Sequence, residues 1–362
     1  MIRLSLLQFR AQAIIALATL AAYAALLAAT GPHLASMYVA DGLATCHGGG
    51  CAEMADYFTG SLAHGPYAVL WLLSQGVILL APAVIGLFWG APLIARELET
   101  GTAALAWNQS VTRTRWLAVK LAAGALIVMA VAEALSLMQT WWAAPISRAV
   151  ADGSGAGVAQ SRFSQLNFAT HGITPLGYAA FAFTLGITAG ALIRRTVPAM
   201  AVTLAVFAAL QVAVPLWVRP NLAPANHTVR PVTSLGVGGP SQTGPGGDTF
   251  SLYALTIAGQ PGAWILSSGP INAAGQATST VPAACASIGN SGVSQSAQGQ
   301  RGGPGASGPI AVVDCMARHG IREAISYQPA SRYWRFQLTE TAIYLALALA
   351  LAGYCFRRLR RL

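Results

Sequence analysis

The sequence predicts an all-α protein that crosses a membrane six times, and composition and hydropathy both lead to this class. Only 9% of the 362 residues are charged and 55% are hydrophobic, whereas a soluble domain carries about 25% charged residues. The mean hydropathy is +0.55. A spanning helix needs about 20 mainly apolar residues. Six stretches meet that requirement: Gln12–Thr30, Tyr67–Gly90, Trp116–Trp142, Ile173–Ile193, Val197–Trp217 and Phe336–Phe356.

The first stretch follows Met1–Arg10, a basic lead-in of the kind that opens a signal peptide. No clear cleavage site precedes a soluble domain, so we interpret the run as a retained helix. The second stretch can continue to Ile94. The fourth and fifth are joined by Arg194-Arg195-Thr196, and Pro198 lies in the first helical turn, where its missing N–H costs no bond. We therefore predict a tight hairpin between these two helices.

The cations predict the orientation, because Lys and Arg accumulate in short cytoplasmic loops. The first predicted outer loop, 31–66, has no Lys or Arg, and the second has only Arg148 and Arg162. Twelve cations fall on the other side: Arg3, Arg10, Arg96, Arg113, Arg115, Lys120, Arg194, Arg195, Arg357, Arg358, Arg360 and Arg361. Both termini are therefore expected in the cytoplasm, with the chain in the plasma membrane. The net charge of +10 lies at helix ends, which predicts membrane anchoring and no nucleic-acid partner.

This topology divides the chain into a transmembrane domain (1–217), an extracytoplasmic domain (218–335), and a last helix with a basic tail (336–362). In the outer domain, Gly236–Asp248 and Ser287–Pro309 are rich in Gly, Ser, Pro and Gln, which predicts loops. Thr249–Leu266 has the apolar content of strands, and Ala311–Tyr327 is predicted as a short helix. We expect a small, loop-rich domain.

Four of the five cysteines fall on the predicted outer side, two in each of two segments: Cys46 with Cys51, and Cys285 with Cys315. An oxidising compartment favours disulfides. Pairing within each segment is expected, and crossed pairing stays open. A metal site at Cys46-His47 and Cys51, with His33 and His64 nearby, is the alternative, but the spacing matches no established zinc pattern.

No catalytic motif is present. Lys120 is the only lysine and follows Val119, so the Gly-Lys-Ser/Thr run of a phosphate-binding loop is missing. There is no G-x-S-x-G or H-E-x-x-H sequence, and no Asp within the six stretches. We expect no enzymatic site, no cofactor and no metal in this chain.

Glu133 lies well inside the third stretch, where a carboxylate costs about 2.5–3.5 kcal/mol. It is a candidate for a translocation path together with Gln75 and Gln139. The alternative is a structural clasp with Gln75, Gln139 or Gln211. Glu340 is expected in the first turn of the sixth helix, where an acid is favoured by the helix dipole.

The segment 96–115 between the second and third stretches combines charge with a helix break. Glu97 and Glu99 precede Gly101 and Thr102, and a short amphipathic helix is predicted over 103–109 with Thr102 as its N-cap. Such a helix lies along the membrane surface. The many inner cations would orient the chain without any partner, but that explanation leaves the two acids and the Gly-Thr break unexplained.

This pattern resembles the coupling segment of type-2 ABC exporter permeases, which carry an acid and Gly-Thr after the second helix, then Ser/Thr-Arg and a Lys entering the third. The matching residues are Glu97, Gly101, Thr102, Ser110, Thr112, Arg113 and Lys120, while Val111 stands where the family usually has proline. The closing stretch 327–337 and the Arg-rich tail resemble actinobacterial ABC permeases.

The resemblance implies a transmembrane half of an exporter for an amphipathic, lipid-like or drug-like substrate. A separate cytoplasmic ATPase, holding ATP and Mg²⁺, would dock on this segment, with contacts expected from Glu97, Glu99, Gly101, Thr102, Leu105, Trp107, Ser110 and Arg113. Two halves are needed, so a homodimer or heterodimer in the lipid bilayer is implied. The alternative is a non-transporting sensor or immunity protein that binds an extracellular ligand, such as an antimicrobial peptide, and signals to a cytoplasmic partner.

Overall fold

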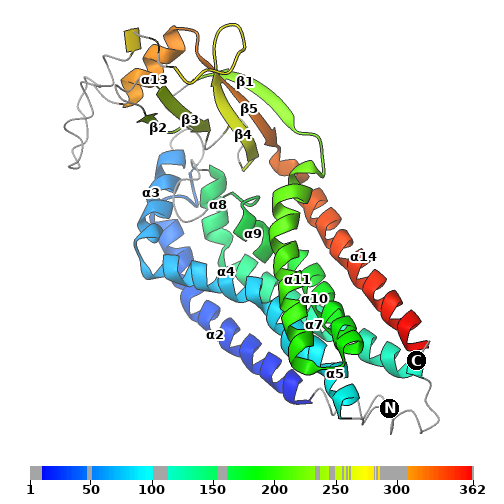
Figure 1. The fold of residues 1–362 in the computed structure, drawn as a ribbon. Coiled ribbons are helices and arrows are strands. Elements are labelled where there is room, and N and C mark those ends of the chain that lie inside the picture. Colours follow the sequence, from blue (N-terminus) through cyan, green and yellow to red (C-terminus); the bar gives the residue numbers. More distant parts are fainter. Residues whose placement is uncertain are drawn as a thin grey trace.

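The computed structural model of the chain describes residues 10–46, 51–100, 113–152, 161–232, 237–243, 249–254, 262–280 and 309–360, together with residues 257, 260, 282, 284 and 285. A bundle of long helices carries a small β-sheet unit at one of its ends (Figure 1). The start of the first helix and the end of the last lie together at the opposite end. We call these the sheet end and the terminal end of the bundle.

Within the described part, six helices are long and apolar enough to cross a membrane, as the hydropathy predicts. Two of the six are not α-helical throughout, because they include π-helical or 3₁₀ turns. The six are α2 (Arg10–Ala40), α4–η1–α5 (Pro66–Ile85, Gly86–Gly90, Ala91–Glu99), α7 (Arg113–Trp142), α10 (Thr174–Ile193), α11–η2–η3 (Thr196–Ala213, Val214–Val218, Arg219–Asn221) and α14 (Tyr333–Arg360).

The first two spans are longer than predicted. Helix α2 continues through Gly31 and Pro32 to Ala40, because Leu34 and Tyr38 are buried in a hydrophobic cluster beyond the proline. The second span continues to Glu99, so Glu97 and Glu99 lie on its last turns rather than in a connecting loop. A π-helical turn, η1, joins α4 to α5.

Helix α10 lies at the centre of the bundle and is buried along nearly its whole length. It contacts α4, η1, α5, α7, α11 and α14. Small residues allow this close packing, as is usual between membrane helices. A Cβ added to Gly90 would lie 2.6 Å from the Phe183 carbonyl oxygen, and one added to Gly190 would lie 2.6 Å from that of Ala91. The backbones of α10 and the second span are therefore in direct contact.

The predicted outer loops contain helices of their own: α3 (Cys51–Ala63), α8 (Ala144–Asp152) and α9 (Gln165–Thr170). All three lie at the sheet end (Figure 1). Helices α3 and α8 pack against each other, and Phe58, Ile146 and Ala149 join the same hydrophobic cluster as Leu34.

The sheet unit contains the antiparallel order β1–β5–β4 and a separate hairpin β2–β3. The strands are β1 (Asn226–Pro231), β2 (Val237–Thr243), β3 (Thr249–Ala254), β4 (Trp264–Ile271) and β5 (Arg322–Gln328), and α13 (Pro309–Arg318) is the helix of this unit. In the register of the sheet, Thr228 and Ser268 both face Ile325 of the central strand β5.

Two expectations for this unit are wrong. The predicted helix over 311–327 ends at Arg318, because Gly320 has φ 77° and turns the chain into strand β5. In β5 the side chains of Glu323 and Ile325 are buried, so the strand period of two applies there. The glycine-rich stretch 236–248 is not wholly loop, since Val237–Thr243 pairs with β3; pairing with a neighbouring strand outweighs its composition.

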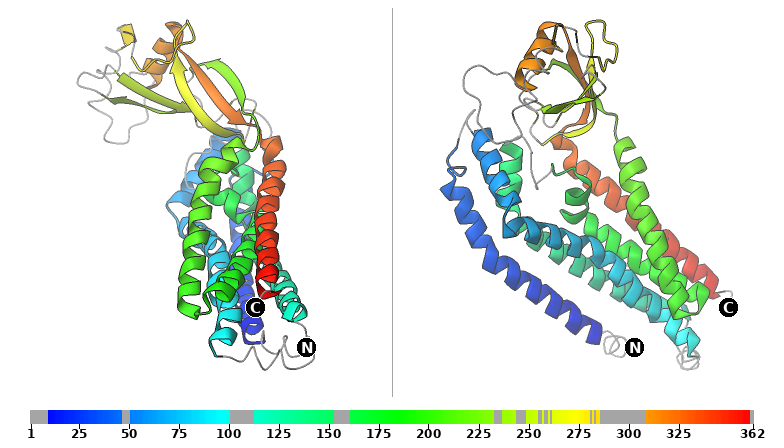
Figure 2. Two further views of the ribbon diagram at one scale, coloured as in Figure 1. Left: turned by 45° about the vertical axis from the view of Figure 1, so that its right-hand side comes forward. Right: turned by 60° about the vertical axis from the view of Figure 1, so that its left-hand side comes forward.

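Aromatic side chains join the sheet unit to the bundle. Phe163 stacks on Trp264 of β4 at 5.6 Å between ring centroids and meets Tyr333 and Phe336 of α14 edge-on at 5.5 and 5.8 Å. The views in Figure 2 show the strands above the ends of α11 and α14. This cluster places the sheet directly over the sheet end of the bundle.

Candidate functional site

An ion pair at the terminal end ties the second span to the third. The Lys120 ammonium of α7 donates to the Glu97 carboxylate of α5 at 2.5 Å, and it also lies 4.5 Å from the Trp116 ring centroid. Lys120 is 2% exposed. Because a buried ammonium needs a charged partner, the pair holds α5 and α7 in a fixed register.

Glu99 makes a second tie, to the hairpin between α10 and α11. Its Oε2 accepts the backbone N–H of Thr196 at 3.2 Å and the Thr196 hydroxyl at 2.7 Å. Thr196 begins α11, so the carboxylate caps a helix N-terminus from another span. The last turns of α5 are thus bonded to both α7 and α11.

The remaining residues of the predicted coupling segment lie between these ties. Gly101, Thr102, Leu105, Trp107 and Ser110, and the short helix expected over 103–109, lie outside the described residues. Arg113 is the first residue of α7. The structure therefore describes the chain up to Thr100 and again from Arg113.

Glu97 and Glu99 accordingly have partners within their own chain. The sequence pattern predicts both acids as contacts for another protein, because the distribution of cations does not explain them. Lys120 and Thr196 lie 23 and 97 residues away in sequence and provide a structural explanation.

Two of the polar residues predicted for a translocation path have hydrogen-bond partners within the chain. The Gln75 side chain donates to Asn167 Oδ1, and the Gln139 Oε1 accepts the Tyr23 hydroxyl at 2.8 Å. Both glutamines are almost fully buried. Each therefore joins helices inside the chain.

Glu133 makes none of the expected clasps. Its Oε2 has no hydrogen-bond partner among the described residues, and Gln211, the third candidate, accepts the Tyr344 hydroxyl at 3.2 Å instead. On α7, Glu133 lies on the same helix stripe as Leu126 and Leu137, which are 65% and 60% exposed. Glu133 itself is only partly exposed, however, and its Oε2 is buried within the chain.

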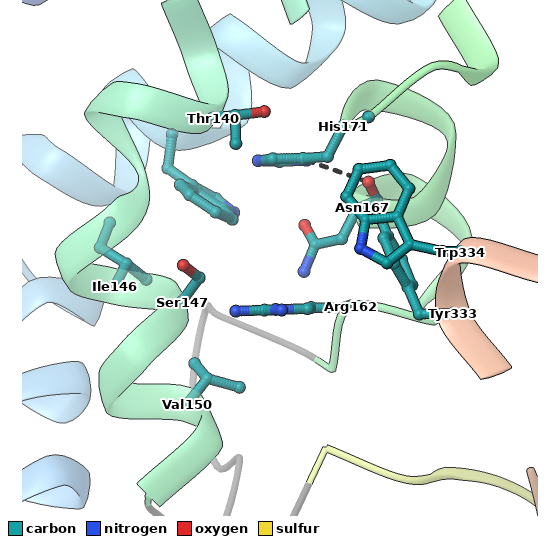
Figure 3. Close-up of a pocket in the computed structure, with 11 residues that line it drawn as sticks. Thr140, Ile146, Ser147, Val150, Arg162, Asn167, His171, Tyr333 and Trp334 are labelled. Carbon is teal, nitrogen blue, oxygen red and sulfur yellow. Dashed lines mark hydrogen bonds between the residues drawn. The ribbon is translucent and has the colours of Figure 1, made fainter. Parts of the chain in front are cut away.

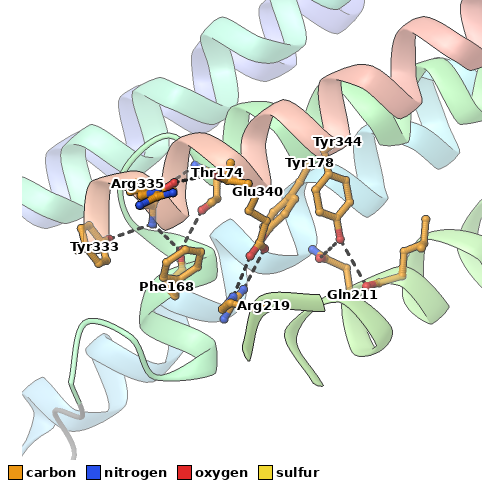
Figure 4. A network of polar contacts seen from close by, with 12 residues as sticks. Phe168, Thr174, Tyr178, Gln211, Arg219, Tyr333, Arg335, Glu340 and Tyr344 are labelled. Atoms are coloured by element: carbon orange, nitrogen blue, oxygen red, sulfur yellow. Dashed lines mark hydrogen bonds and ion pairs between the residues drawn. The ribbon is translucent and has the colours of Figure 1, made fainter. Parts of the chain in front are cut away.

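A buried charge network was missed in the sequence. Glu340 is the eighth residue of α14, not part of its first turn, and is fully buried. Arg219 reaches it with Nε–Oε2 and Nη2–Oε1 distances of 2.8 and 2.9 Å, and the Tyr178 hydroxyl donates to Oε1 at 2.5 Å (Figure 4). The arginine also lies 4.0 Å from the Phe168 ring centroid.

This network joins α10, η3 and α14. The signal available in the sequence was an acid inside an apolar helix, together with an arginine directly after the fifth span. Such charges are expensive in a membrane unless they pair. Their separation by 121 residues, however, leaves the partner undetermined.

The cysteines form the pairs expected within each segment, Cys46–Cys51 and Cys285–Cys315, so the first pair does not provide thiolate ligands for a metal. Cys285, Cys315 and His319 form a cluster in which His319 Nδ1 lies 3.7 and 3.8 Å from the two sulfurs. The disulfide occupies both cysteines there as well. Cys355 is a buried free thiol at the terminal end of α14.

Comparison with known proteins identifies the bundle. A family model described as ABC-2 membrane transporter related matches residues 17–219, which include the first five spans and the segment between α5 and α7. No curated protein and no solved structure matches the chain. The resemblance to ABC permeases is confirmed by this match. Because the match covers more than half of the 362 residues, the chain belongs to the ABC-2 membrane transporter related family and is a multi-pass protein of the plasma membrane.

Proposed function

We propose that this chain is the permease half of an ATP-driven exporter, with the terminal end of the bundle in the cytoplasm and the sheet unit outside. A separate ATPase, which holds ATP and Mg²⁺, docks at the segment between α5 and α7. A second permease half, identical or related, completes the transport unit. The cargo is amphipathic or lipid-like, in keeping with the apolar spans. The family match supports the permease assignment and does not favour a sensor or immunity protein.

The observation that carries the proposal is the pair of ties around this segment. Glu97 bonds to Lys120 of α7, and Glu99 bonds to Thr196 of α11. A displacement of the segment therefore reaches three spans at once, because α5 also packs directly against α10 and α11. Packed helices switch between discrete arrangements rather than deforming continuously.

In this mechanism, closure of the ATPase dimer pushes the docked segment, and the ties pass the movement to α7 and α11. The central helix α10 packs against α5, α7 and α11. It would either move with them or stay in place while they turn around it. At the other end, α10 and α14 are held together through Tyr178 and Glu340. The bundle would then turn as a unit about its buried centre, opening toward the outside.

For the path itself, Glu133 is the remaining candidate among the three polar residues. Gln75 and Gln139 are bonded within the chain. Glu133 is partly exposed on α7, beside the exposed Leu126 and Leu137, where a second half or the cargo would approach it. An intramembrane acid requires such a partner, water or protonation.

The first prediction tests the ties. The chain is co-purified with a candidate ABC ATPase, and hydrolysis is measured in nanodiscs. Glu97→Gln removes the charge partner of Lys120, and we expect permease-dependent ATP hydrolysis to fall by about five- to tenfold while the ATPase still co-purifies. Gly101→Pro, within the docking segment, should reduce association itself.

Glu53→Gln is the matched control, since Glu53 is an exposed acid on α3 at the sheet end. It should leave both association and hydrolysis unchanged. If Glu97→Gln and Gly101→Pro also leave both unchanged, the coupling proposal is wrong. If no ATPase associates with the wild-type chain, the exporter assignment itself fails.

A further inference from the structure

A cavity opens at the sheet end of the bundle, far from the segment between α5 and α7. Its volume is about 160 Å³. Helices α4, α7, α8, α9 and α14 and the turn after α9 all contribute to its wall. The lining residues are Trp71, Thr140, Ile146, Ser147, Val150, Arg162, Asn167, His171, Gly172, Tyr333 and Trp334. Figure 3 shows these side chains around the open space.

One wall of the cavity is aromatic and aliphatic. Trp71 of α4 is buried and lies 5.8 Å from the His171 ring and 6.2 Å from Trp142, between centroids. Ile146 and Val150 of α8 extend this wall, and Trp334, which is 59% exposed, stands at the lip. A ring or an alkyl chain is the chemistry that such a wall accepts.

The cavity also carries a positive charge next to α8. The Arg162 guanidinium lies beside Ser147 of α8 in Figure 3 and lines the cavity. No carboxylate among the described residues forms an ion pair with it. A guanidinium presents paired N–H donors that match a carboxylate or phosphate. The charge is therefore available to an anionic group inside the cavity.

His171 adds a hydrogen-bond acceptor. Its Nδ1 lies 2.9 Å from the Asn167 backbone carbonyl, which can only accept, so Nδ1 carries the proton and Nε2 has a free lone pair. Burial, with a smaller contribution from the neighbouring Arg162 charge, lowers the pKa of His171 to about 4. The ring is thus neutral at pH 7, and its free end is directed into the cavity (Figure 3).

We propose that this cavity binds the head of an anionic amphipathic molecule, with its acidic oxygens on Arg162, a hydroxyl donating to His171 Nε2, and its apolar part against Trp71 and Ile146. A phosphate monoester or a hydroxyl-bearing phosphodiester has this chemistry. A dry cavity of about 150 Å³ holds a molecule the size of benzene. The head group therefore fits inside, and a longer chain leaves past Trp334 toward the membrane.

Binding here needs neither an ATPase nor transport, so it is tested on the purified full-length chain. The chain is placed in nanodiscs of neutral phosphatidylcholine and titrated at pH 7 with decyl phosphate, with binding followed by tryptophan fluorescence against empty nanodiscs. Decanol, which lacks the charge, and inorganic phosphate, which lacks the chain, are the comparison probes. We expect decyl phosphate to bind at least about tenfold more tightly than either.

Arg162→Gln should weaken decyl phosphate binding by about tenfold or more and leave decanol unaffected. The matched control is Arg148→Gln, an exposed arginine of α8 that does not line the cavity; it should change binding by less than about twofold. Ser147→Phe, which fills the space from α8, should abolish binding. Thermal unfolding of each variant checks that the fold is retained.

Equal binding of decyl phosphate and decanol would overturn the proposal. So would equal losses in Arg162→Gln and Arg148→Gln, which would indicate general surface charge. Nanodiscs that contain phosphatidylglycerol then distinguish the source of the ligand. Competition by this lipid in the wild-type chain but not in Arg162→Gln identifies a membrane lipid head group; lack of competition identifies a free amphipathic molecule.

Discussion

Each deeply buried charge in the described part of the bundle is matched to a specific partner. Lys120 meets Glu97 near the terminal end, and Arg219 meets Glu340 and, through it, Tyr178 toward the sheet end. The second pair is bidentate, which is the geometry that best offsets the loss of water around both ions. Glu133 differs, because it is partly exposed and its buried Oε2 has no hydrogen-bond partner among the described residues.

At this scale the structure predicts a strong asymmetry between single and double substitutions. Arg219→Met leaves the buried Glu340 carboxylate uncompensated and should destabilise the chain by about 3–5 kcal/mol. The double variant Arg219→Met with Glu340→Gln removes both charges and should recover much of that loss. Denaturant unfolding in micelles, read by tryptophan fluorescence, measures both.

Arg148→Met, on the exposed side of α8, is the control and should cost less than about 0.5 kcal/mol. Strictly additive losses in the double variant would contradict the buried pair. Such additivity is expected only where two residues act independently.

Single residues also show where sequence reasoning stopped. The sequence predicts a sixth span that begins at Phe336, which places Glu340 in its first turn. The helix begins at Tyr333 instead, so Glu340 lies further along it. Gln75, Gln139 and Gln211 were recognised as sparse polar groups in apolar helices. Their partners, Asn167, Tyr23 and Tyr344, could not be inferred, because each lies on another element distant in the chain.

Among the elements, α10 organises the bundle through its small residues. A Cβ on Gly186 would meet the Gly86 carbonyl oxygen and, at 2.7 Å, the Ala91 nitrogen, so α10 and the second span approach as closely as backbones can. The π-helical turn η1 lies in this contact. The chain thus brings its most irregular spanning helix against its most buried one.

The prediction for this contact is a difference in sign between two glycine substitutions. Gly186→Ala should destabilise the chain by about 1–3 kcal/mol, because the added methyl overlaps the backbone of the second span. Gly76→Ala, in α4 with open space around it, should be neutral or stabilising by up to about 1 kcal/mol, since alanine favours the helix.

Unfolding midpoints of both variants, measured side by side in the same micelles, decide the matter. Equal effects of the two substitutions would mean that helix propensity alone governs them and that the close contact has no energetic weight.

The bounds of an element can be predicted where the local sequence sets them, and they cannot be where contacts with distant residues set them. The six spans were placed correctly because a run of apolar residues is a local property. The continuation of α2 beyond Pro32 and of α5 to Glu99 was missed, because both extensions are held by contacts with other helices. The segment of strand β5 is predicted as helix, because a short mixed segment has no clear hydrophobic period. Its pairing partners, β1 and β4, lie elsewhere in the chain.

On the scale of the whole molecule, the two ends of the bundle carry different features. One end carries the start of α2, the end of α14 and the bonds around the segment between α5 and α7; the other carries the sheet unit, both disulfides and the cavity beside Arg162. An ATPase and an anionic amphipathic ligand would therefore act at opposite faces of one bundle, with α10 between them.

The cations predict which of these two ends faces the cytoplasm. Ala274→Cys, in an exposed turn of the sheet unit, should react with an impermeant maleimide added outside right-side-out vesicles. Arg358→Cys, at the exposed terminal end of α14, should react only in inverted vesicles. The reverse pattern would contradict the orientation inferred from the cations, and the wild-type chain is the control, because its one free cysteine, Cys355, is buried.

The sequence by itself determined the membrane class, the six spans and the resemblance to ABC permeases, because hydropathy and short motifs are read within about 20 neighbouring residues. It also singled out the acids at Glu97 and Glu99. Only the tertiary structure decided that these acids bond to α7 and α11, that Arg219 neutralises Glu340, and that Arg162 and His171 face one cavity. The physical reason is that a charge or a hydrogen bond is satisfied by whichever group is near in space, and in this bundle those groups come from helices far apart in the chain.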